Sequence, residues 1–462
     1  MLEKIAQIFS YSYIAAMALA FIILFHLFFF KTGFGRRIAV SLKRLLVKRK
    51  TKPAPGSWGT DIRVYVMKPA QENGAGPKKF LGFYMAPETV REIKLFFLIS
   101  GAAIGSRLML YVVAYLGAVI IAGVQGGFFQ TLSGLWNQWD SGMYIFIAKN
   151  WYVTVTDKKY LIVFFPLFPI MMRIFSLVLK DFFVSGIVVS NLSLCFSCYY
   201  LYKLARLDYN KYVSSNAVKY LLIFPFSFFL GACFSDGLFL ALSIMSFYYM
   251  RKQKWLMVGI CGFFATLTRN FGILLAIPAV IEYLSNQANY QPFKLWRTIR
   301  YGLSMLLIPL GYGVYLLINK LVTGSWTTFL KYQEEYWYHH LAFFPDLGQN
   351  LLNIFSSEWS IEDRIAIWIP QLTLIIIVAA LIFYALKRIR YSYIVYMFIY
   401  LLLCLSMTWL LSGARYILGI VPLYLLLALL SRNRYVNMAI SFISYILLGF
   451  YTVAYVIGYR VM

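Results

Sequence analysis

The chain is poor in acidic residues. Only 17 of its 462 residues are Asp or Glu, whereas 43 are Lys or Arg, and the formal net charge is +26. Nucleic-acid-binding proteins also carry a basic surplus, but here the basic residues mostly lie in short segments between apolar runs. That is the positive-inside pattern of membrane proteins, so we expect no nucleic-acid partner. Each carboxylate is then informative, because an ionised Asp at the bilayer centre costs at least ~2.5–3.5 kcal/mol.

Charge of either sign is scarce, and so are cysteine and histidine. Charged residues make up 13% of the chain and hydrophobic residues 61%, more than a soluble domain could bury. We therefore predict an all-α membrane protein with several spans. The five cysteines (Cys195, Cys198, Cys233, Cys261 and Cys404) all lie in apolar runs, which argues against a disulfide framework. With three histidines and no acidic cluster, the composition predicts neither a metal nor another cofactor.

Residues 1–30 are predicted to form an N-terminal transmembrane helix, since the run 11–30 is apolar and long enough to span a bilayer. Few basic residues precede this run and many follow it, which places the N-terminus outside the cell. The basic stretch 31–52 has the apolar spacing of an amphipathic helix, and we expect it to lie on an anionic leaflet. Together with the Pro- and Gly-containing residues 53–94, it would make residues 31–94 a small cytoplasmic unit.

Residues 95–462 are predicted to form the transmembrane core. Together with the N-terminal helix, we expect a bundle of about 11–13 transmembrane or re-entrant helices. The apolar segments of the core lie at 95–122, 162–180, 183–204, 216–233, 237–250, 255–268, 271–284, 300–318, 366–386, 391–411, 415–430 and 436–457.

The basic clusters test this layout. If spans alternate from residue 216 onward, the clusters at 251–254, 387–390 and 432–434 all fall in the cytoplasm. The alternation fails once. Two apolar segments lie between residues 160 and 215, where an odd number of crossings is needed. We therefore predict that one of the two is re-entrant or interfacial.

The same layout places the unusual polar residues on the external side. They are Asp140, Asp236, Arg269, Asn270 and Arg415, together with the external loops at about 123–160 and 319–365. A purely structural membrane protein has no reason to gather its rare charges at one face. A functional site on that face is the prediction that follows.

Each of these charges also has a structural interpretation. Asp140 follows an apolar segment within the run 136–144, where an Asp often caps a helix. Asp236 opens an apolar run and is equally suited to capping it. Arg269 and Arg415 stand at ends of apolar segments, from which arginine side chains reach lipid headgroups. The sequence leaves these alternatives open beside a role in a site.

Several motifs together resemble the second mannosyltransferase of GPI-anchor assembly (the PIG-V family) and its prokaryotic relatives, which belong to the GT-C class of membrane glycosyltransferases. The similarity covers about residues 95–430. The family usually has Glu where Asp236 stands, and Gly where Trp151 stands. The matching residues are Trp139-Asp140, Tyr144, Ile147-Ala148, Tyr152, Phe164-Phe165-Pro166-Leu167-Phe168-Pro169, Arg173, Phe234-Ser235-Asp236-Gly237-Leu238-Phe239, Thr268-Arg269-Asn270-Phe271-Gly272, Gly413-Ala414-Arg415-Tyr416 and Pro422.

The resemblance implies a GT-C-like bundle in which the first external loop is catalytic. It implies an inverting transfer of mannose or another hexose from a polyprenyl-phosphate donor to a lipid, glycan or polymer acceptor. The family's essential Asp corresponds to Asp140. The leaving phosphate needs no general acid, so one base for the acceptor hydroxyl suffices. The prokaryotic relatives imply a bacterial or archaeal cell membrane with the site facing outward.

The remaining site residues follow from chemistry and from the resemblance. Arg269 and Arg415 are expected to bind the donor phosphate, since a guanidinium can hold two phosphate oxygens. Trp136 and Trp139 can face a sugar ring or anchor the chain at the interface. The predicted substrate-binding residues are Trp136, Trp139, Tyr144, Asp236, Asn270, His339, His340 and Tyr416.

Two other classes of function fit the composition. A membrane transporter or lipid flippase is the main alternative, although the chain has no internal repeat of the kind such proteins often show. A non-catalytic membrane scaffold, with the basic stretch 31–52 as its working part, is the other. The sugar, the acceptor and the oligomeric state cannot be read from the sequence.

Overall fold

The structure is a computed structural model, and it describes residues 78–80, 83–287, 295–338, 340, 352–356, 358–407 and 412–461. These residues form helices apart from one short antiparallel hairpin, β1 (Lys78–Phe80) with β2 (Phe83–Met85). The predicted N-terminal helix at 1–30 and the amphipathic helix at 31–52 lie outside the described residues.

The helices follow the apolar segments of the sequence. The longer ones are α3 (Pro87–Ala122), α6 (Leu167–Leu179), α7 (Phe182–Arg206), α8 (Lys211–Ile223), α9 (Asp236–Arg251), α10 (Trp255–Thr268), α11 (Ala276–Gln287), α12 (Leu295–Thr323), α16 (Ile369–Ala385), α17 (Tyr391–Leu405) and α20 (Arg434–Val456). The shorter ones are α4 (Phe128–Trp136), α5 (Asp140–Asn150), α13 (Thr328–Trp337), α15 (Ile361–Asp363), α18 (Gly413–Tyr416) and α19 (Val421–Leu430). Single turns connect several of them: η2 (Lys159–Val163), η3 (Ser227–Leu230), η4 (Asn270–Leu275), η5 (Arg364–Trp368) and η6 (Ile417–Gly419).

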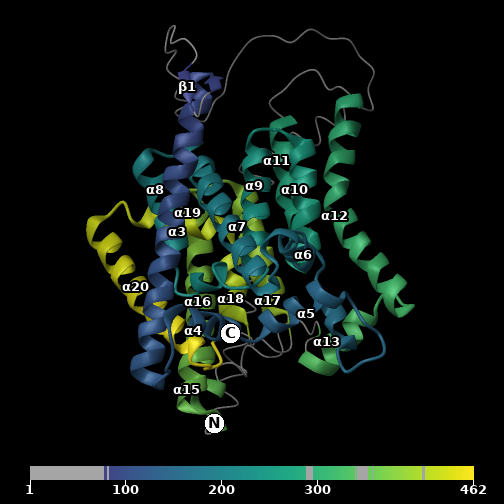
Figure 1. Cartoon of the computed structure of the whole chain (residues 1–462). Coiled ribbons are helices and arrows are strands. Elements are labelled where there is room, and N and C mark those ends of the chain that lie inside the picture. The colour runs from purple at the N-terminus through teal and green to yellow at the C-terminus, as the bar shows by residue number, and fades with distance from the viewer. Residues whose placement is uncertain are drawn as a thin grey trace, which may run out of the picture.

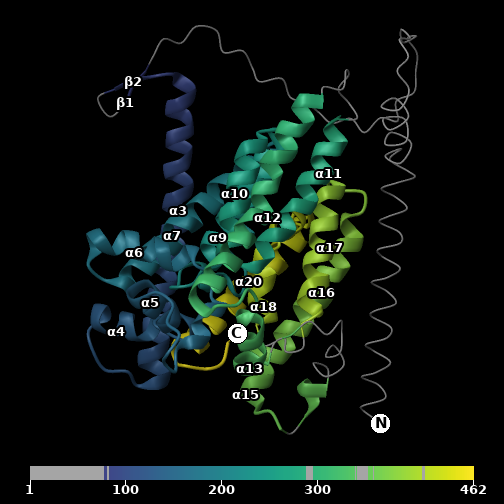
Figure 2. The same cartoon turned by 90° about the vertical axis from the view of Figure 1, so that its right-hand side faces the viewer.

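The long helices run roughly side by side between two ends of the molecule (Figure 1). The hairpin continues into the start of α3 at one end, and the short helices α4, α5, α13 and α15 gather at the other. Figure 2 shows α11 beside α17, and α10 beside α12. The short helices α4 and α5 therefore lie at the end of the bundle opposite the hairpin.

Among the described residues, five helical segments are long and apolar enough to cross a membrane, or six if a bent pair counts as one span. The bent pair, Gly413–Gly419 with Val421–Leu430, turns by 84°. This confirms the prediction of a helical membrane protein with several spans. The five segments are Pro87–Ala122, Phe182–Arg206, Thr298–Thr323, Ile361–Ala385 and Arg434–Val456.

The helix lengths bear on the region where the charge alternation fails. Helix α7 has 25 residues and qualifies as a span, whereas α6 has 13 residues. At about 1.5 Å per residue, α6 is roughly 20 Å long, against a hydrocarbon core of about 30 Å. Of the two segments, α7 alone passes the length test, while the prediction that one of them is re-entrant or interfacial stays a prediction.

Close backbone contact holds α10 against α12. The two helices meet at glycines: a Cβ on Gly259 would collide with the Ser304 carbonyl oxygen, and one on Gly311 with the Phe263 carbonyl oxygen. In a membrane, helices gain nothing by hiding apolar side chains from lipid, so small residues that allow close packing provide much of the attraction. Helix α10 has only 14 residues and depends on this contact for its place beside the site.

A buried arginine joins α3 to the end of α8. The Arg107 side chain is 1% exposed and donates to the carbonyl oxygens of Ser227 (2.5 Å) and Leu222 (2.7 Å). No carboxylate pairs with it among the described residues. The last carbonyls of a helix lack partners within the helix, and its C-terminus carries a partial negative charge. Arg107 satisfies both needs where α8 ends.

We expect the Arg107→Met variant to lower the unfolding temperature of the detergent-solubilised protein. The substitution removes the charged donor from two buried carbonyl oxygens, of which Leu222 keeps the Ser227 hydroxyl, and a buried acceptor left without a donor costs about 1–3 kcal/mol. Differential scanning fluorimetry measures the effect, and Arg107→Lys should recover part of it. The exposed Arg91 on the same helix provides the control, because Arg91→Met removes a charge without exposing a buried acceptor. An Arg107→Met protein with the same unfolding temperature as the wild type would contradict this account.

Candidate functional site

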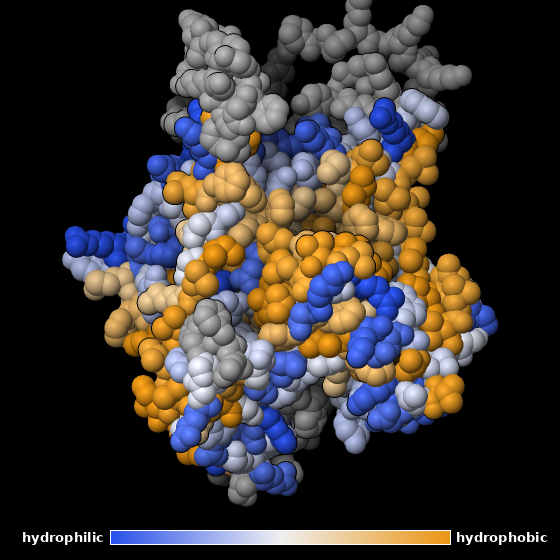
Figure 3. Space-filling view, in the orientation of Figure 1, coloured by the Kyte–Doolittle hydropathy of each residue, from blue (hydrophilic) through white to orange (hydrophobic). Residues whose placement is uncertain are grey.

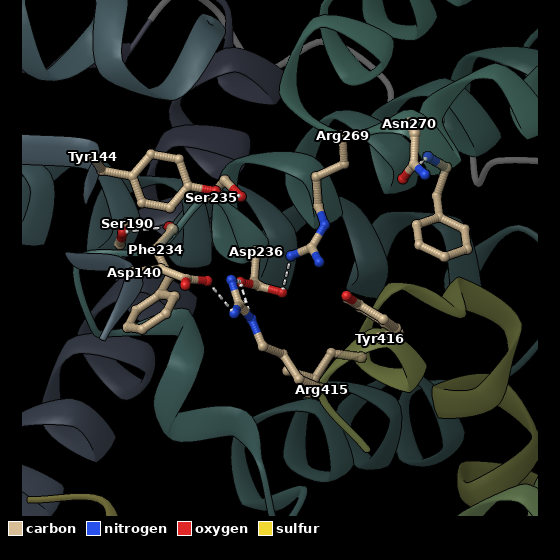
Figure 4. A network of polar contacts seen from close by, with 12 residues as sticks. Asp140, Tyr144, Ser190, Phe234, Ser235, Asp236, Arg269, Asn270, Arg415 and Tyr416 are labelled. Carbon is tan, nitrogen blue, oxygen red and sulfur yellow. Dashed lines mark hydrogen bonds and ion pairs between the residues drawn. The ribbon is translucent and has the colours of Figure 1, made fainter. Parts of the chain in front are cut away.

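Four charged residues from distant parts of the chain meet in one cluster, which we call the acid–arginine network: Asp140, Asp236, Arg269 and Arg415 (Figure 4). Arg415 lies between the two acids. Its Nη1 donates to Asp140 Oδ2 at 2.6 Å, and its Nε and Nη2 both lie 2.9 Å from Asp236 Oδ2. Arg269 donates to the other oxygen of Asp236. The sequence prediction that these charges share one site is consistent with this arrangement.

The network is largely shielded from solvent, and its charges balance. The side chains of Asp236 and Arg415 are 5% and 6% exposed, and that of Asp140 is 22% exposed. Aromatic rings form part of the wall, since the Arg415 guanidinium lies 4.5 Å from the ring centre of Phe234. Two carboxylates and two guanidinium groups sum to zero charge, which removes much of the penalty for placing ions in a poorly hydrated region. Asp140 is the most accessible acid of the network.

Every member of the network stands at the end of a helix. Asp140 and Asp236 occupy the first turns of α5 and α9, where a carboxylate is favoured by ~0.3–1 kcal/mol. Arg269 follows α10 in an extended conformation, and Arg415 belongs to α18, just before the bend. Asp236 lies in the first turn of α9 without capping it, because its two carboxylate oxygens accept from Arg269 and Arg415.

The motif residues around Asp140 hold α5 in place. Arg173 on α6 donates to the carbonyl oxygens of Ala148 (2.7 Å) and Lys149 (2.9 Å) in the last turn of α5. Tyr144 is hydrogen-bonded to Ser235 at 2.8 Å, which ties the middle of α5 to the residue before Asp236. These contacts fix α5 from two sides, and with it the position of Asp140.

The chain turns sharply into and out of α5. Trp139, just before the helix, has a φ of 47°, and Trp151, just after it, has a φ of 67°. Bulky residues rarely adopt positive φ, and such strain of about 1–3 kcal/mol persists only where the surroundings enforce it. The Trp139 ring packs edge-on against Tyr455 at 5.5 Å, so contacts with α20 help to hold the residue before Asp140.

We expect the Arg173→Gln variant to loosen α5. Hydrogen bonds from a charged donor contribute ~1.5–3 kcal/mol, so amide hydrogen exchange in the α5 segment should be about tenfold faster or more. Mass spectrometry of peptides from this segment measures the change. Lys180→Gln, at the exposed end of the same helix α6, serves as the control. Unchanged exchange in Arg173→Gln would mean that other contacts position α5.

The structure places the two predicted tryptophans differently. Trp136 is 2% exposed and packs against Tyr111 and Tyr455, with ring centres 4.8 and 5.6 Å away. Its ring has no face left for a sugar, so the prediction that Trp136 contacts substrate is wrong, and so is the interfacial interpretation. The reason is that α4 folds back onto α3 and α20. Trp139 is partly exposed and lies next to Asp140.

The other predicted site residues differ in whether they lie beside the acid–arginine network. Tyr416 lies beside the network, with the Arg269 guanidinium 5.3 Å from its ring centre. Asn270 points away from it, and its side-chain oxygen accepts from the Phe271 backbone N–H (Figure 4). His340 is exposed at the end of α13 and lies 3.7 Å from Glu334. His339 lies outside the described residues.

Sequence reasoning missed the aromatic residues that connect the network with α13. The Phe164 ring lies 5.1 Å from Tyr144 and 5.9 Å from Trp337 on α13. Phe164 belongs to a motif noted in the sequence, but that motif does not reveal which rings it touches. The part of the chain that the structure describes contains no group of three or more His, Cys, Asp or Glu residues arranged to hold a metal.

Comparison with known proteins gives no family assignment. No protein-family model matches the chain, and no curated protein matches it at a significant level. The resemblance to the GT-C glycosyltransferases therefore stays a prediction, and the network has to support a functional proposal through its own geometry.

Proposed function

We propose that this protein is an inverting membrane glycosyltransferase that uses a polyprenyl-phosphate sugar and has Asp140 as its general base. One observation carries the proposal. Asp140 is a partly exposed carboxylate whose Oδ2 is held by Arg415, while its Oδ1 has no partner among the described residues. A base needs such a combination: one oxygen fixes the orientation and the other is available to a hydroxyl.

The proposed reaction uses this placement. The hydroxyl oxygen of the acceptor attacks the anomeric carbon of the sugar from the face opposite the phosphate. The bond between that carbon and the phosphate oxygen breaks, and the lipid phosphate leaves with the bonding electrons. Asp140 Oδ1 takes the hydroxyl proton. No acid is required, which agrees with a site whose second carboxylate, Asp236, is already held by two arginines.

The two arginines have different roles in this proposal. Arg415 uses Nε and Nη2 on Asp236 and Nη1 on Asp140, so it positions the base. Among the described residues, Arg269 contacts one acid, through Nη1, and its remaining N–H groups are the ones that can bind phosphate oxygens. Arg269 is therefore the better candidate for the donor phosphate, with Tyr416 beneath its guanidinium.

The proposal includes the full predicted layout. A bundle of about 11–13 transmembrane or re-entrant segments would place the network at the external face. Short helices such as α6, α10 and α17 would then surround a site within reach of a lipid-linked donor. The acceptor would be a lipid, glycan or polymer outside a bacterial or archaeal cell membrane.

Transfer by the purified full chain tests the proposal. The protein in nanodiscs is incubated with polyprenyl-phosphate mannose carrying a radiolabelled sugar, then with other labelled hexoses, and with a membrane lipid and glycan extract as acceptor. We expect a labelled product and an equal amount of released polyprenyl phosphate. If no hexose is transferred, and proteoliposomes instead move a fluorescent donor analogue across the bilayer, the transporter class replaces the enzyme.

A further inference from the structure

A cavity of about 800 Å³ lies between α3, α8 and α20, away from the acid–arginine network. Its two main walls differ in chemistry. The α3 wall is mostly apolar, from Leu95 to Val113. The α8 wall carries Lys211, Ser215 and Lys219, which follow one another at intervals of four residues and so form one stripe along the helix.

The cavity holds positive charge that no carboxylate balances. Arg107, Lys211 and Lys219 line it, and its lining includes no acidic residue among those the structure describes. Lys219 donates to Asn437 and Ser441, which are neutral. By contrast, Lys203 and Arg251 elsewhere in the bundle have acidic partners.

Two such pairs lie close by. Lys203 is 2.9 Å from Glu92, and Arg251 pairs with Asp208. Three cations gather around one hollow whose lining includes no acidic residue among those described, which favours an anionic occupant.

The shape of the cavity indicates what the rest of that occupant is. The α3 wall extends over 18 residue steps, about 27 Å at 1.5 Å per residue, close to the thickness of one hydrocarbon core. Lys211 and Leu95 lie near the starts of α8 and α3, at the hairpin end of the bundle. Figure 3 shows apolar residues across the middle of this face and hydrophilic residues toward its ends. A charged headgroup near the lysines and a long apolar chain along α3 match this pattern.

We propose that the cavity between α3, α8 and α20 binds a lipid with a phosphate headgroup. The phosphate lies at the Lys211–Lys219 stripe, and the hydrocarbon chain lies along the α3 wall. Arg107 adds positive potential at the floor, while its hydrogen bonds stay with the end of α8. The site does not depend on the proposed glycosyl transfer.

Native mass spectrometry of the delipidated full chain tests this proposal. The probes are phosphatidylglycerol, undecaprenyl phosphate and the zwitterionic phosphatidylcholine. We expect one anionic lipid to bind at least tenfold more tightly than phosphatidylcholine, and the preference between the two anionic lipids identifies the source of the phosphate. Equal binding of all three lipids would overturn the proposal. Displacement of the lipid by inorganic phosphate at millimolar concentration would assign the site to the free anion and also overturn it.

Two pairs of variants locate the binding. Lys219→Gln keeps a polar partner for Asn437 and Ser441 and should weaken binding of the anionic lipid by roughly fivefold. Lys203→Gln, outside the cavity, should not. Ala102→Trp fills the space beside α3, whereas Leu108→Trp on the same helix lies outside the lining. The proposal fails if the members of either pair bind lipid equally while their unfolding temperatures match the wild type.

Discussion

The Asp140→Asn variant is expected to lose sugar transfer by about 10²–10⁴-fold, the usual contribution of a positioned base. Asn retains the size of the side chain and can still contact Arg415, but it cannot take a proton from the acceptor. Initial rates of label transfer from polyprenyl-phosphate sugar measure the loss. The unfolding temperature should change little, because Asp140 is the most exposed acid of the network. The loss of rate would then not be explained by a loss of stability.

A matched control comes from the same loop. Asp157 has a side chain that is 83% exposed and touches only its neighbour Lys158. Asp157→Asn should therefore transfer sugar at the wild-type rate. If Asp140→Asn stays within about threefold of the wild type, well short of the effect of a base, the assignment of Asp140 has to be abandoned, whatever the network does for stability.

The Arg415→Leu variant is expected to destabilise the protein by about 3–5 kcal/mol, the effect of removing one partner from a buried ionic cluster. Asp236 keeps Arg269, but Asp140 loses its one cationic partner among the described residues, and the network gains a net negative charge. Chemical unfolding in detergent, followed by tryptophan fluorescence, measures the change. Replacing Arg434, which is exposed at the start of α20, by Leu should have little effect.

A second substitution tests whether charge balance is the cause. In the double variant Arg415→Leu with Asp140→Asn, one cation and one anion are removed together, and the pair of Asp236 with Arg269 remains. We expect it to be more stable than Arg415→Leu alone, with a coupling of ~0.5–3 kcal/mol. Additive effects of the two substitutions would mean that Arg415 acts through packing against Phe234 and not through its charge.

The sequence predicts the helices well because hydrophobic runs and capping residues determine where they begin and end. Helix α10 begins and ends where the apolar run 255–268 does, and α9 extends the run 237–250 by one residue at each end. Some helices begin at polar residues that cap them, such as Asp181, whose side chain accepts from the Val184 N–H at 2.7 Å. Hydrophobic length and capping are local properties, so they can be read without knowing the fold.

The partners within the site are not local. Arg415 and Asp140 are 275 residues apart, and nothing between them indicates that they touch. The sequence predicted that the charges share one face of the membrane, but it assigned both arginines to phosphate, whereas Arg415 is engaged by two acids. Trp136 was misjudged for a similar reason, since its burial depends on how α4 folds back onto α3 and α20.

The zero net charge of the acid–arginine network also bears on the product of the proposed transfer. A sugar phosphodiester brings about one negative charge, whereas the phosphomonoester left by transfer carries about −1.5 to −2 at neutral pH. A neutral cluster offers this extra charge no net attraction, although keeping it away from water becomes more unfavourable. The lipid phosphate product is thus expected to bind more weakly than the donor. One copy of the protein could then turn over repeatedly without being inhibited by its product.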